Sequence, residues 1–396
     1  MADSATPPSR EFKRFSHWAT IADFCRCAAL TVGFLTILAA CSPPRAIEAI
    51  GVLRDIAATS APGGLPPADS APRAIPVSYR GAEAGRTGDL FALDGARAGL
   101  VLVPGASKAG KDDPRLRAFA KSLARAGFVV LVPEIETLRR LLVRPEDAEE
   151  IVDAVDYLSR RLATRIGIAA ISYATGPAVL AALDARVRRK VGFVIAVGGY
   201  YDIDAVVTYF TTGKFRDAPG QPWRYQRPNV YGKWVFVRSN LPRIRDDADR
   251  SLLRAISDRK IADPKADTAA LEARLGREGG GIMALLTNTD PDAVPGLIAD
   301  LPPAIRRDMA GLDLDRRDLT GLVAHLILIH GRDDTIIPFT ESVALAAAAA
   351  PDRASLFLVD GLAHVDLRPA GLSDALTLWR AVYRLLEERD KISQDR

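Results

Sequence analysis

A serine, an aspartate and a histidine occur in that order along this chain, each just after a short apolar segment. Ser172 follows an apolar run with small neighbours, Asp334 follows Leu326–Ile329, and His364 follows Leu356–Val359. A serine hydroxyl is a poor nucleophile until a base removes its proton. A histidine can act as that base, and an aspartate can hold the imidazole in the required tautomer. The three residue types therefore match a triad for acyl transfer.

Each of these residues also has a common structural role. A serine at the end of a strand often caps a helix, an aspartate beside glycine often forms a turn, and a lone histidine often lies on the surface. The order of the three residues and their shared placement after apolar segments favour the triad over three unrelated roles. His325 and His330 flank one apolar segment, and we predict structural roles for both.

The segments around the three residues predict alternating strands and helices. Arg165–Gly176 runs from an apolar strand through a turn at Ser172 into a helical pattern, as in a nucleophile elbow. Continuous apolar runs indicate strands that are buried on both faces. We expect a doubly wound, mostly parallel sheet of the α/β class. The expected strands are 75–79, 88–93, 100–103, 128–132, 165–171, 191–197, 326–329 and 355–359, and the expected helices of this sheet are 113–126, 145–162, 177–183, 342–350 and 373–388.

The alternation stops near Gly199 and resumes near Leu326. Residues 200–322 show helical patterns and no strand, so we expect a helical cap inserted into the sheet domain 76–396. Ten aromatic residues fall between Tyr200 and Phe236, and most are expected to form the core of the cap. Tyr200 and Tyr201 directly follow a core strand and are the expected substrate contacts. The expected helices are 229–239, 247–262, 268–275, 281–286 and 292–312.

From residue 76 to about residue 390 the sequence resembles the α/β-hydrolase superfamily. The pattern Gly-x-x-Asp-x-x-Ile-Pro occurs at Gly331–Pro338, which implies that Asp334 is the acid, with its neighbour Asp333 as the alternative. The resemblance also implies an oxyanion hole formed by the backbone N–H groups of Ala106 and Tyr173.

The elbow departs from the family pattern at two positions. The family usually has Gly-x-Ser-x-Gly, whereas this chain has Ala170 and Ala174 on either side of Ser172. Alanine is small enough for the close approach of strand and helix, so we expect the turn to form.

Residues 105–111 also fit the phosphate-loop pattern Gly-x₄-Gly-Lys between a strand and a helix. The next residue is Asp112, which lacks the hydroxyl that binds Mg²⁺ and would place a carboxylate beside a phosphate. We therefore expect Lys108 and Lys111 to lie at the rim of the site, and we expect no nucleotide or other cofactor.

Composition bounds the remaining possibilities. The chain has 396 residues, a formal net charge of +4 and 48% hydrophobic residues, as is usual for a globular protein. Its charges are interspersed without a polybasic block, which argues against a nucleic-acid partner. No group of His, Asp and Glu has metal-ligand spacing, so no metal is expected.

The N-terminus indicates where the protein acts. Basic residues precede the apolar run Ala28–Ala40, which is short for a membrane span and suits a signal peptide. The sequence around Cys41 resembles the lipobox of bacterial lipoproteins, which implies cleavage after residue 40 and lipidation of Cys41. A short membrane anchor is the alternative. Residues 41–75 are predicted to be an Ala/Pro-rich tether with one short helix at 47–56.

We expect a serine hydrolase that cleaves carboxylic esters, lipid-anchored in the bacterial cell envelope and facing the periplasm. The expected substrate is a small ester with an apolar acyl or aromatic group. An acyltransferase with the same triad is the second possibility, because sequence does not separate water from an alcohol as acceptor. A non-catalytic binding protein is the third, and the two alanines of the elbow are its only support.

Overall fold

The computed structural model describes residues 42–60, 72–363, 366–367 and 371–395. The chain divides into two compact units, Met1–Ile47 and Glu48–Arg396. The described part of the first unit is the start of a helix, and the sheet and its site belong to the second unit. No helix among the described residues is both long and apolar enough to cross a membrane.

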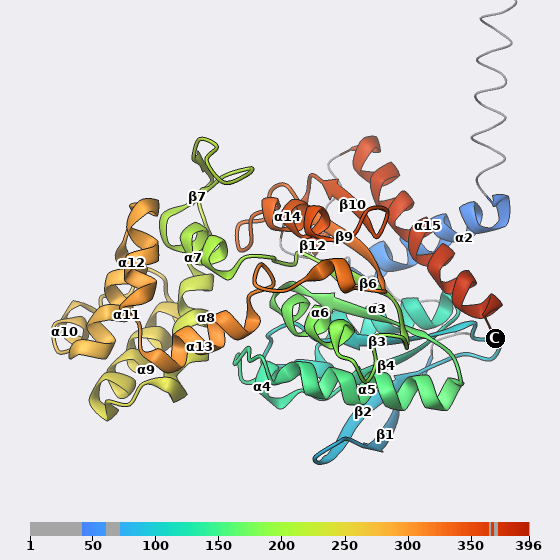
Figure 1. Ribbon diagram of the computed structural model, residues 1–396, viewed down its shortest axis with the longest axis horizontal. Coiled ribbons are helices and arrows are strands. Elements are labelled where there is room, and N and C mark those ends of the chain that lie inside the picture. The colour runs from blue at the N-terminus through green and yellow to red at the C-terminus, as the bar shows by residue number, and fades with distance from the viewer. Residues whose placement is uncertain (1–41, 61–71, 364–365, 368–370, 396) are drawn as a thin grey trace, which may run out of the picture. The chain divides into compact units, whose positions relative to one another are not determined.

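An eight-stranded, mostly parallel sheet organises the second unit, as expected from the sequence (Figure 1). Its strand order is β1-β2-β4-β3-β5-β6-β9-β10. β2 runs antiparallel to β1 and β4, and the other neighbours are parallel. The expected α/β class is therefore confirmed. The strands are β1 Ile75–Arg80, β2 Gly85–Phe91, β3 Ala98–Val103, β4 Phe128–Pro133, β5 Ile166–Ile171, β6 Val191–Val197, β9 His325–Gly331 and β10 Ala354–Val359.

Helices cover both faces of the sheet because its central strands are apolar on both sides. Buried side chains of α5, α6 and α14 form one hydrophobic core with the sheet. Buried side chains of α2, α3 and α15 form a second core on the other face. These helices are α2 Pro43–Ser60, α3 Pro114–Arg125, α5 Asp147–Leu162, α6 Thr175–Leu183, α14 Thr340–Ala348 and α15 Leu372–Gln394, and a short helix, α4, spans Glu136–Arg139.

A helical insertion, residues 198–324, separates β6 from β9 and lies together at the left of Figure 1. Its buried residues form a third hydrophobic core, which includes Tyr200, Phe210 and Trp234 from the aromatic-rich stretch. Its helices are α7 Ile203–Thr212, α8 Tyr231–Asn240, α9 Asp247–Ala262, α10 Ala269–Glu272, α11 Arg277–Thr287, α12 Val294–Ala299 and α13 Pro303–Leu312.

The insertion differs from the sequence expectation in three places. The expected helix 292–312 is two helices, α12 and α13, because Pro302 and Pro303 cannot continue the helix that precedes them. Helix α7 was not expected. The hairpin β7 Lys214–Phe215 with β8 Arg224–Tyr225 supplies short strands where none were predicted. Outside the insertion, a second short pair, β11 Leu362–Ala363 with β12 Asp366–Leu367, follows β10.

Helix α2 is longer than the short helix expected at 47–56. Ala49 and Val52 are buried in the second core. Glu48 accepts hydrogen bonds from Arg389 at 2.5 and 2.8 Å, and the Arg389 side chain is fully buried. From Glu48 onward, this part of the expected tether therefore packs against the sheet domain.

Candidate active site

The central parallel strands bring their carboxyl ends to one edge of the sheet. Val103 of β3 pairs with Ala170 of β5, and Ile171 pairs with Val197 of β6. β9 follows on the other side of β6. The turns after these four strands therefore meet, and they carry Ala106, Ser172, Gly198 and Asp334. Ligands of open α/β sheets bind at such carboxyl ends.

Ser172 lies in the turn between β5 and α6, in a left-handed backbone conformation with φ of +57°. It begins a short 3₁₀ turn, Ser172–Ala174, that leads directly into α6. A positive φ is uncommon for a residue other than glycine and marks local strain. The side chain is 6% exposed. This is the strand–turn–helix geometry expected of a nucleophile elbow.

The two alanines of the elbow are buried, with Ala170 1% and Ala174 0% exposed. Small side chains are required here, because strand and helix approach closely. Gly176, in the first turn of α6, has the tightest surroundings: a Cβ atom there would lie 1.8 Å from the Tyr200 hydroxyl. The Tyr200 hydroxyl donates a hydrogen bond to the Leu312 carbonyl at 3.1 Å.

The turn after β3 lies beside the elbow. A Cβ atom on Gly105 would be 3.4 Å from the Ile171 carbonyl oxygen, and Ile171 directly precedes Ser172. This contact places the Gly105–Ala106 turn next to the elbow. The backbone N–H of Tyr173 lies at the start of the turn into α6, where unpaired N–H groups and the helix dipole favour negative charge.

Asp334 is 1% exposed and lies in the turn that follows β9. Its Oδ1 accepts hydrogen bonds from the backbone N–H groups of Ile336 at 2.7 Å and Ile337 at 3.1 Å. Its Oδ2 lies on the side of β6, 3.4 Å from where a Cβ of Gly198 would stand. The carboxylate is therefore fixed by its own loop with one oxygen directed toward the neighbouring strand end.

Asp333, the alternative acid, has a different environment. Its Oδ1 lies 2.9 Å from where a Cβ of Gly331 would stand. The same oxygen is buried and accepts no hydrogen bond from the described residues. The structure therefore holds the carboxylate of Asp334 in place by backbone donors, and it provides no such donors for this oxygen of Asp333.

His330 is fully buried under the Asp334 loop, in the structural role expected for it. Its Nε2 lies 3.0 Å from the Ile337 carbonyl, and its Nδ1 lies 2.7 Å from the Ser342 hydroxyl. With the proton on Nε2, the imidazole donates to Ile337 and accepts from Ser342. His325, the other histidine expected to be structural, is at the start of β9, so it is at the opposite edge of the sheet from Ser172. Burial lowers the pKa of His325 to about 4.

The insertion holds the Asp334 loop from the other side. The Tyr209 hydroxyl donates to the Asp334 carbonyl at 3.2 Å, and the Gln226 amide donates to the same oxygen at 3.3 Å. The backbone N–H of Asn229 donates to the Thr335 carbonyl at 2.7 Å. The sequence does not reveal this role of Tyr209 and Gln226, because it depends on the folded position of the loop.

Tyr200 and Tyr201, the two expected substrate contacts, have different positions. The Tyr200 ring lies 6.3 Å from the Tyr173 ring and lines a pocket between the elbow and the insertion. Tyr201 does not line that pocket. Its backbone N–H donates to Glu341 at 3.0 Å, and its carbonyl accepts from Leu314 at 3.0 Å. Tyr201 therefore belongs to the junction between β6 and the insertion.

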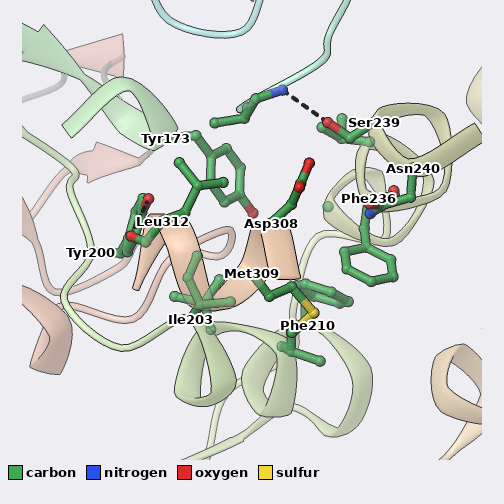
Figure 2. Close-up of a pocket in the computed structure, with 15 residues that line it drawn as sticks. Tyr173, Tyr200, Ile203, Phe210, Phe236, Ser239, Asn240, Asp308, Met309 and Leu312 are labelled. Carbon is green, nitrogen blue, oxygen red and sulfur yellow. Dashed lines mark hydrogen bonds between the residues drawn. The ribbon is translucent and has the colours of Figure 1, made fainter. Parts of the chain in front are cut away.

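The pocket has a volume of about 80 Å³ and is largely apolar (Figure 2). It begins at Tyr173, the residue after Ser172, and extends between α7, α8 and α13. Neither Ser172 nor Asp334 lines it. A pocket with apolar walls and a few polar groups is the usual form of a site for small molecules. Its lining residues are Val143, Tyr173, Tyr200, Ile203, Val206, Val207, Phe210, Gly232, Val235, Phe236, Ser239, Asn240, Asp308, Met309 and Leu312.

The segment that fits a phosphate-loop pattern does not have the arrangement of one. Lys111 lies 2.9 Å from Asp112 and 3.3 Å from Asp89, so its ammonium group is paired with carboxylates. Asp113 caps the following helix by accepting from the Arg115 N–H, and it thereby occupies the helix end where a phosphate would bind.

Two predicted site residues, His364 and Cys41, lie outside the described residues, as does the predicted signal peptide. Within the described ranges, no group of three or more His, Cys, Asp or Glu side chains could hold a metal ion.

Comparisons with known proteins complete the description of the site. No protein-family model matches the chain, and no curated protein matches it. Among solved structures, it is similar to a dienelactone hydrolase from Anabaena variabilis, with 15% identity over 79% of this chain and 97% of that one and a TM-score of 0.42. An esterase from Pyrococcus furiosus has 12% identity over 84% of this chain and 96% of the esterase, with a TM-score of 0.44. An acylaminoacyl peptidase has 13% identity over 80% of this chain and 41% of the peptidase, with a TM-score of 0.45. This chain therefore spans less than half the length of that protein.

Proposed function

We propose that this protein is a serine hydrolase that cleaves carboxylic esters through an acyl-enzyme, with Ser172 as nucleophile. The observation that carries the proposal is the positive φ of a serine between a central parallel strand and a helix. Residues held in sparsely populated backbone conformations cluster at active sites. Here this conformation would direct the hydroxyl group out of the sheet edge toward a substrate.

The proposed mechanism assigns one task to each group. His364 removes the Ser172 proton as the hydroxyl attacks the ester carbonyl, and it then protonates the leaving alcohol. Asp334 orients the imidazole and stabilises its protonated form. The N–H groups of Ala106 and Tyr173 donate to the oxyanion, and each such donor contributes about 10²–10³ in rate. Water, activated by the same histidine, then releases the acid.

The proposal includes the helical insertion as a cap over the site. Its support is the pocket, whose walls come mainly from the insertion, with Tyr173 of the elbow and Val143 of the sheet domain. Lipidation of Cys41 in a bacterial envelope is a separate part of the proposal, and it rests on the sequence around that cysteine. Replacement of Cys41 by alanine should abolish incorporation of labelled lipid in cells, and continued labelling would refute this part.

A fluorophosphonate probe tests the central assignment. The protein from residue 42 onward should be labelled, and Ser172→Ala should not be labelled and should lose ester turnover. The matched control is Ser107→Ala, a serine in the neighbouring turn that the proposal leaves out of the chemistry. If Ser172→Ala is labelled and turns over substrate at the rate of the unchanged protein, the proposed function is wrong. Adding an alcohol during turnover separates the two acceptors, because a transferase would give the new ester.

The acid is tested by exchanging each of two neighbouring aspartates for asparagine. Asp334→Asn should lower kcat by about 10³–10⁴, because an asparagine donor would stabilise the wrong tautomer of the imidazole. Asp333→Asn should lower kcat by less than about tenfold. Rates for both variants with one nitrophenyl ester, together with their circular dichroism spectra, check this prediction. A larger loss in Asp333→Asn would move the acid by one residue.

A further inference from the structure

The pocket beside the elbow has one carboxylate among its walls, and most of its other polar groups already have partners. The Ser239 hydroxyl donates to the Leu141 carbonyl at 2.9 Å and accepts from the Val143 N–H at 3.0 Å. The Asn240 amide group donates to the Phe236 carbonyl at 2.8 Å. The Tyr200 hydroxyl is bonded to Leu312. The hydroxyl protons of Ser239 and Tyr200 are therefore already donated to carbonyl oxygens, and the Asn240 amide group uses one of its two N–H donors.

Asp308 of α13 is different. Its Oδ2 forms an ion pair with Arg243, whose side chain is 10% exposed. None of the described residues donates a hydrogen bond to its Oδ1. Figure 2 shows the Asp308 side chain among the residues that enclose the pocket, with Tyr173 and Met309 near it in this view. A carboxylate has about four acceptor sites, so the ion pair leaves acceptor capacity that faces the pocket.

The charges around Asp308 decide which donor it can accept. Arg243 neutralises Asp308 and also donates to the Ser239 carbonyl at 2.8 Å. Because this ion pair balances the charge of Asp308, the carboxylate favours a neutral hydroxyl over an ammonium group as its further partner.

We infer that the pocket binds the acyl chain of the substrate and that Asp308 accepts a hydrogen bond from a hydroxyl group carried by that chain. This inference rests on the proposed function. An unsubstituted alkyl chain would displace water from the carboxylate and provide no replacement donor, which is unfavourable for a polar group. A terminal hydroxyl provides that donor. The enzyme should therefore prefer ω-hydroxy aliphatic esters to their unsubstituted counterparts.

Matched pairs of methyl esters from butanoate to octanoate, with and without a terminal hydroxyl group, test the preference in a pH-stat assay. At the chain length that brings the hydroxyl group to Asp308, kcat/KM should be about tenfold higher for the hydroxy ester. A preference of less than twofold at every chain length would overturn the inference. So would a stronger preference for the corresponding ω-amino ester, because that would require a negative site.

Three variants assign the preference to Asp308. In Asp308→Ala the ratio of the two kcat/KM values should fall to about one. Asp308→Asn retains an amide oxygen as acceptor, so at least a third of the preference should remain, and it serves as the second variant if the alanine protein fails to fold. Asp300→Ala removes an exposed carboxylate from the same insertion and should keep the full ratio. An unchanged ratio in Asp308→Ala would show that this carboxylate does not select the substrate.

Binding without turnover separates this inference from the proposed function. Ligand-observed NMR with hexan-1-ol and hexane-1,6-diol requires no catalysis. The diol should bind the unchanged protein more tightly than the alcohol does, and this difference should disappear in Asp308→Ala. If the Ser172 tests fail while this difference is present, the pocket assignment stands and the proposed function falls. If the difference is absent, the pocket assignment is wrong.

Discussion

The backbone at Ser172 is strained because a serine occupies a conformation that glycine adopts freely. A single residue of this kind costs about 1–3 kcal/mol, which the surrounding structure must offset. Buried β5 on one side and α6 on the other fix the turn, and the alanines at positions 170 and 174 leave room for it. The departure from the usual glycines therefore does not prevent the elbow from forming.

Close packing behind the elbow gives a prediction for Gly176. In Gly176→Ala the new methyl group would overlap the Tyr200 hydroxyl, so Tyr200 must move and lose its hydrogen bond to Leu312. We expect the free energy of unfolding to fall by about 1–3 kcal/mol, measured by urea denaturation. The control is Gly280→Ala in α11, where a Cβ meets nothing within 4 Å. That variant should be more stable by up to about 1 kcal/mol. Equal stability of the two variants would contradict the prediction.

Residues differ in how well the sequence reveals them. Ser172 could be found because a strand pattern, small neighbours and a helix pattern are adjacent in the chain. Asp308 could not, because a carboxylate in an amphipathic helix usually faces solvent, and its partner Arg243 is distant in sequence. Only the folded insertion places Asp308, paired with Arg243, in the wall of a pocket that Tyr173 also lines.

At the scale of elements, buried strands were the easiest to predict. β3 and β5 are continuous apolar runs, and their expected bounds differ from the observed ones by one or two residues. α7 was missed because its β-branched and aromatic residues do not favour helix. Its ends did carry signals: the Asp202 side chain caps the first turn, and Gly213 ends the helix with φ of +73°.

The link between α7 and the Asp334 loop leads to a prediction for Tyr209. Tyr209→Phe removes the hydroxyl that donates to the Asp334 carbonyl, and Gln226 remains as the second donor. Stability should fall by about 1 kcal/mol, and kcat should fall about threefold to tenfold as the loop loses order. KM should change less than kcat, because Tyr209 does not line the pocket.

The matched control is Tyr225→Phe, which changes a tyrosine that is 63% exposed in the neighbouring hairpin. Its stability and kcat should match those of the unchanged protein. If Tyr209→Phe has the same kcat as this control, the Tyr209 hydroxyl does not position Asp334 for turnover.

For the molecule as a whole, a buried carboxylate should make stability depend on pH. Glu341 accepts hydrogen bonds from the N–H groups of Tyr201 and Asp202, and burial raises its pKa to about 8. A raised folded-state pKa means that the folded protein holds a proton that the unfolded chain releases near pH 4.5. The contribution of this group is therefore fully present below about pH 4.5 and is lost as pH rises through about 8.

Glu341→Gln should remove much of this dependence, because glutamine is neutral at every pH and keeps an acceptor oxygen. Between pH 5 and pH 8 the Tm of the unchanged protein should fall by several degrees, and that of Glu341→Gln should fall by less. A smaller slope will remain, since burial also raises the pKa of Asp202. Thermal melts at four pH values check this, and parallel curves for the two proteins would contradict it.

Three residues of the insertion donate hydrogen bonds to the loop that carries Asp334. They are Tyr209, Gln226 and Asn229. This has a consequence for engineering. A chimera that exchanges this insertion for another, in order to gain a new specificity, would also remove donors from the carbonyls of Asp334 and Thr335. The grafted segment must therefore supply equivalent donors at the same two oxygens, or the chimera will acquire a new pocket and lose the alignment of Asp334.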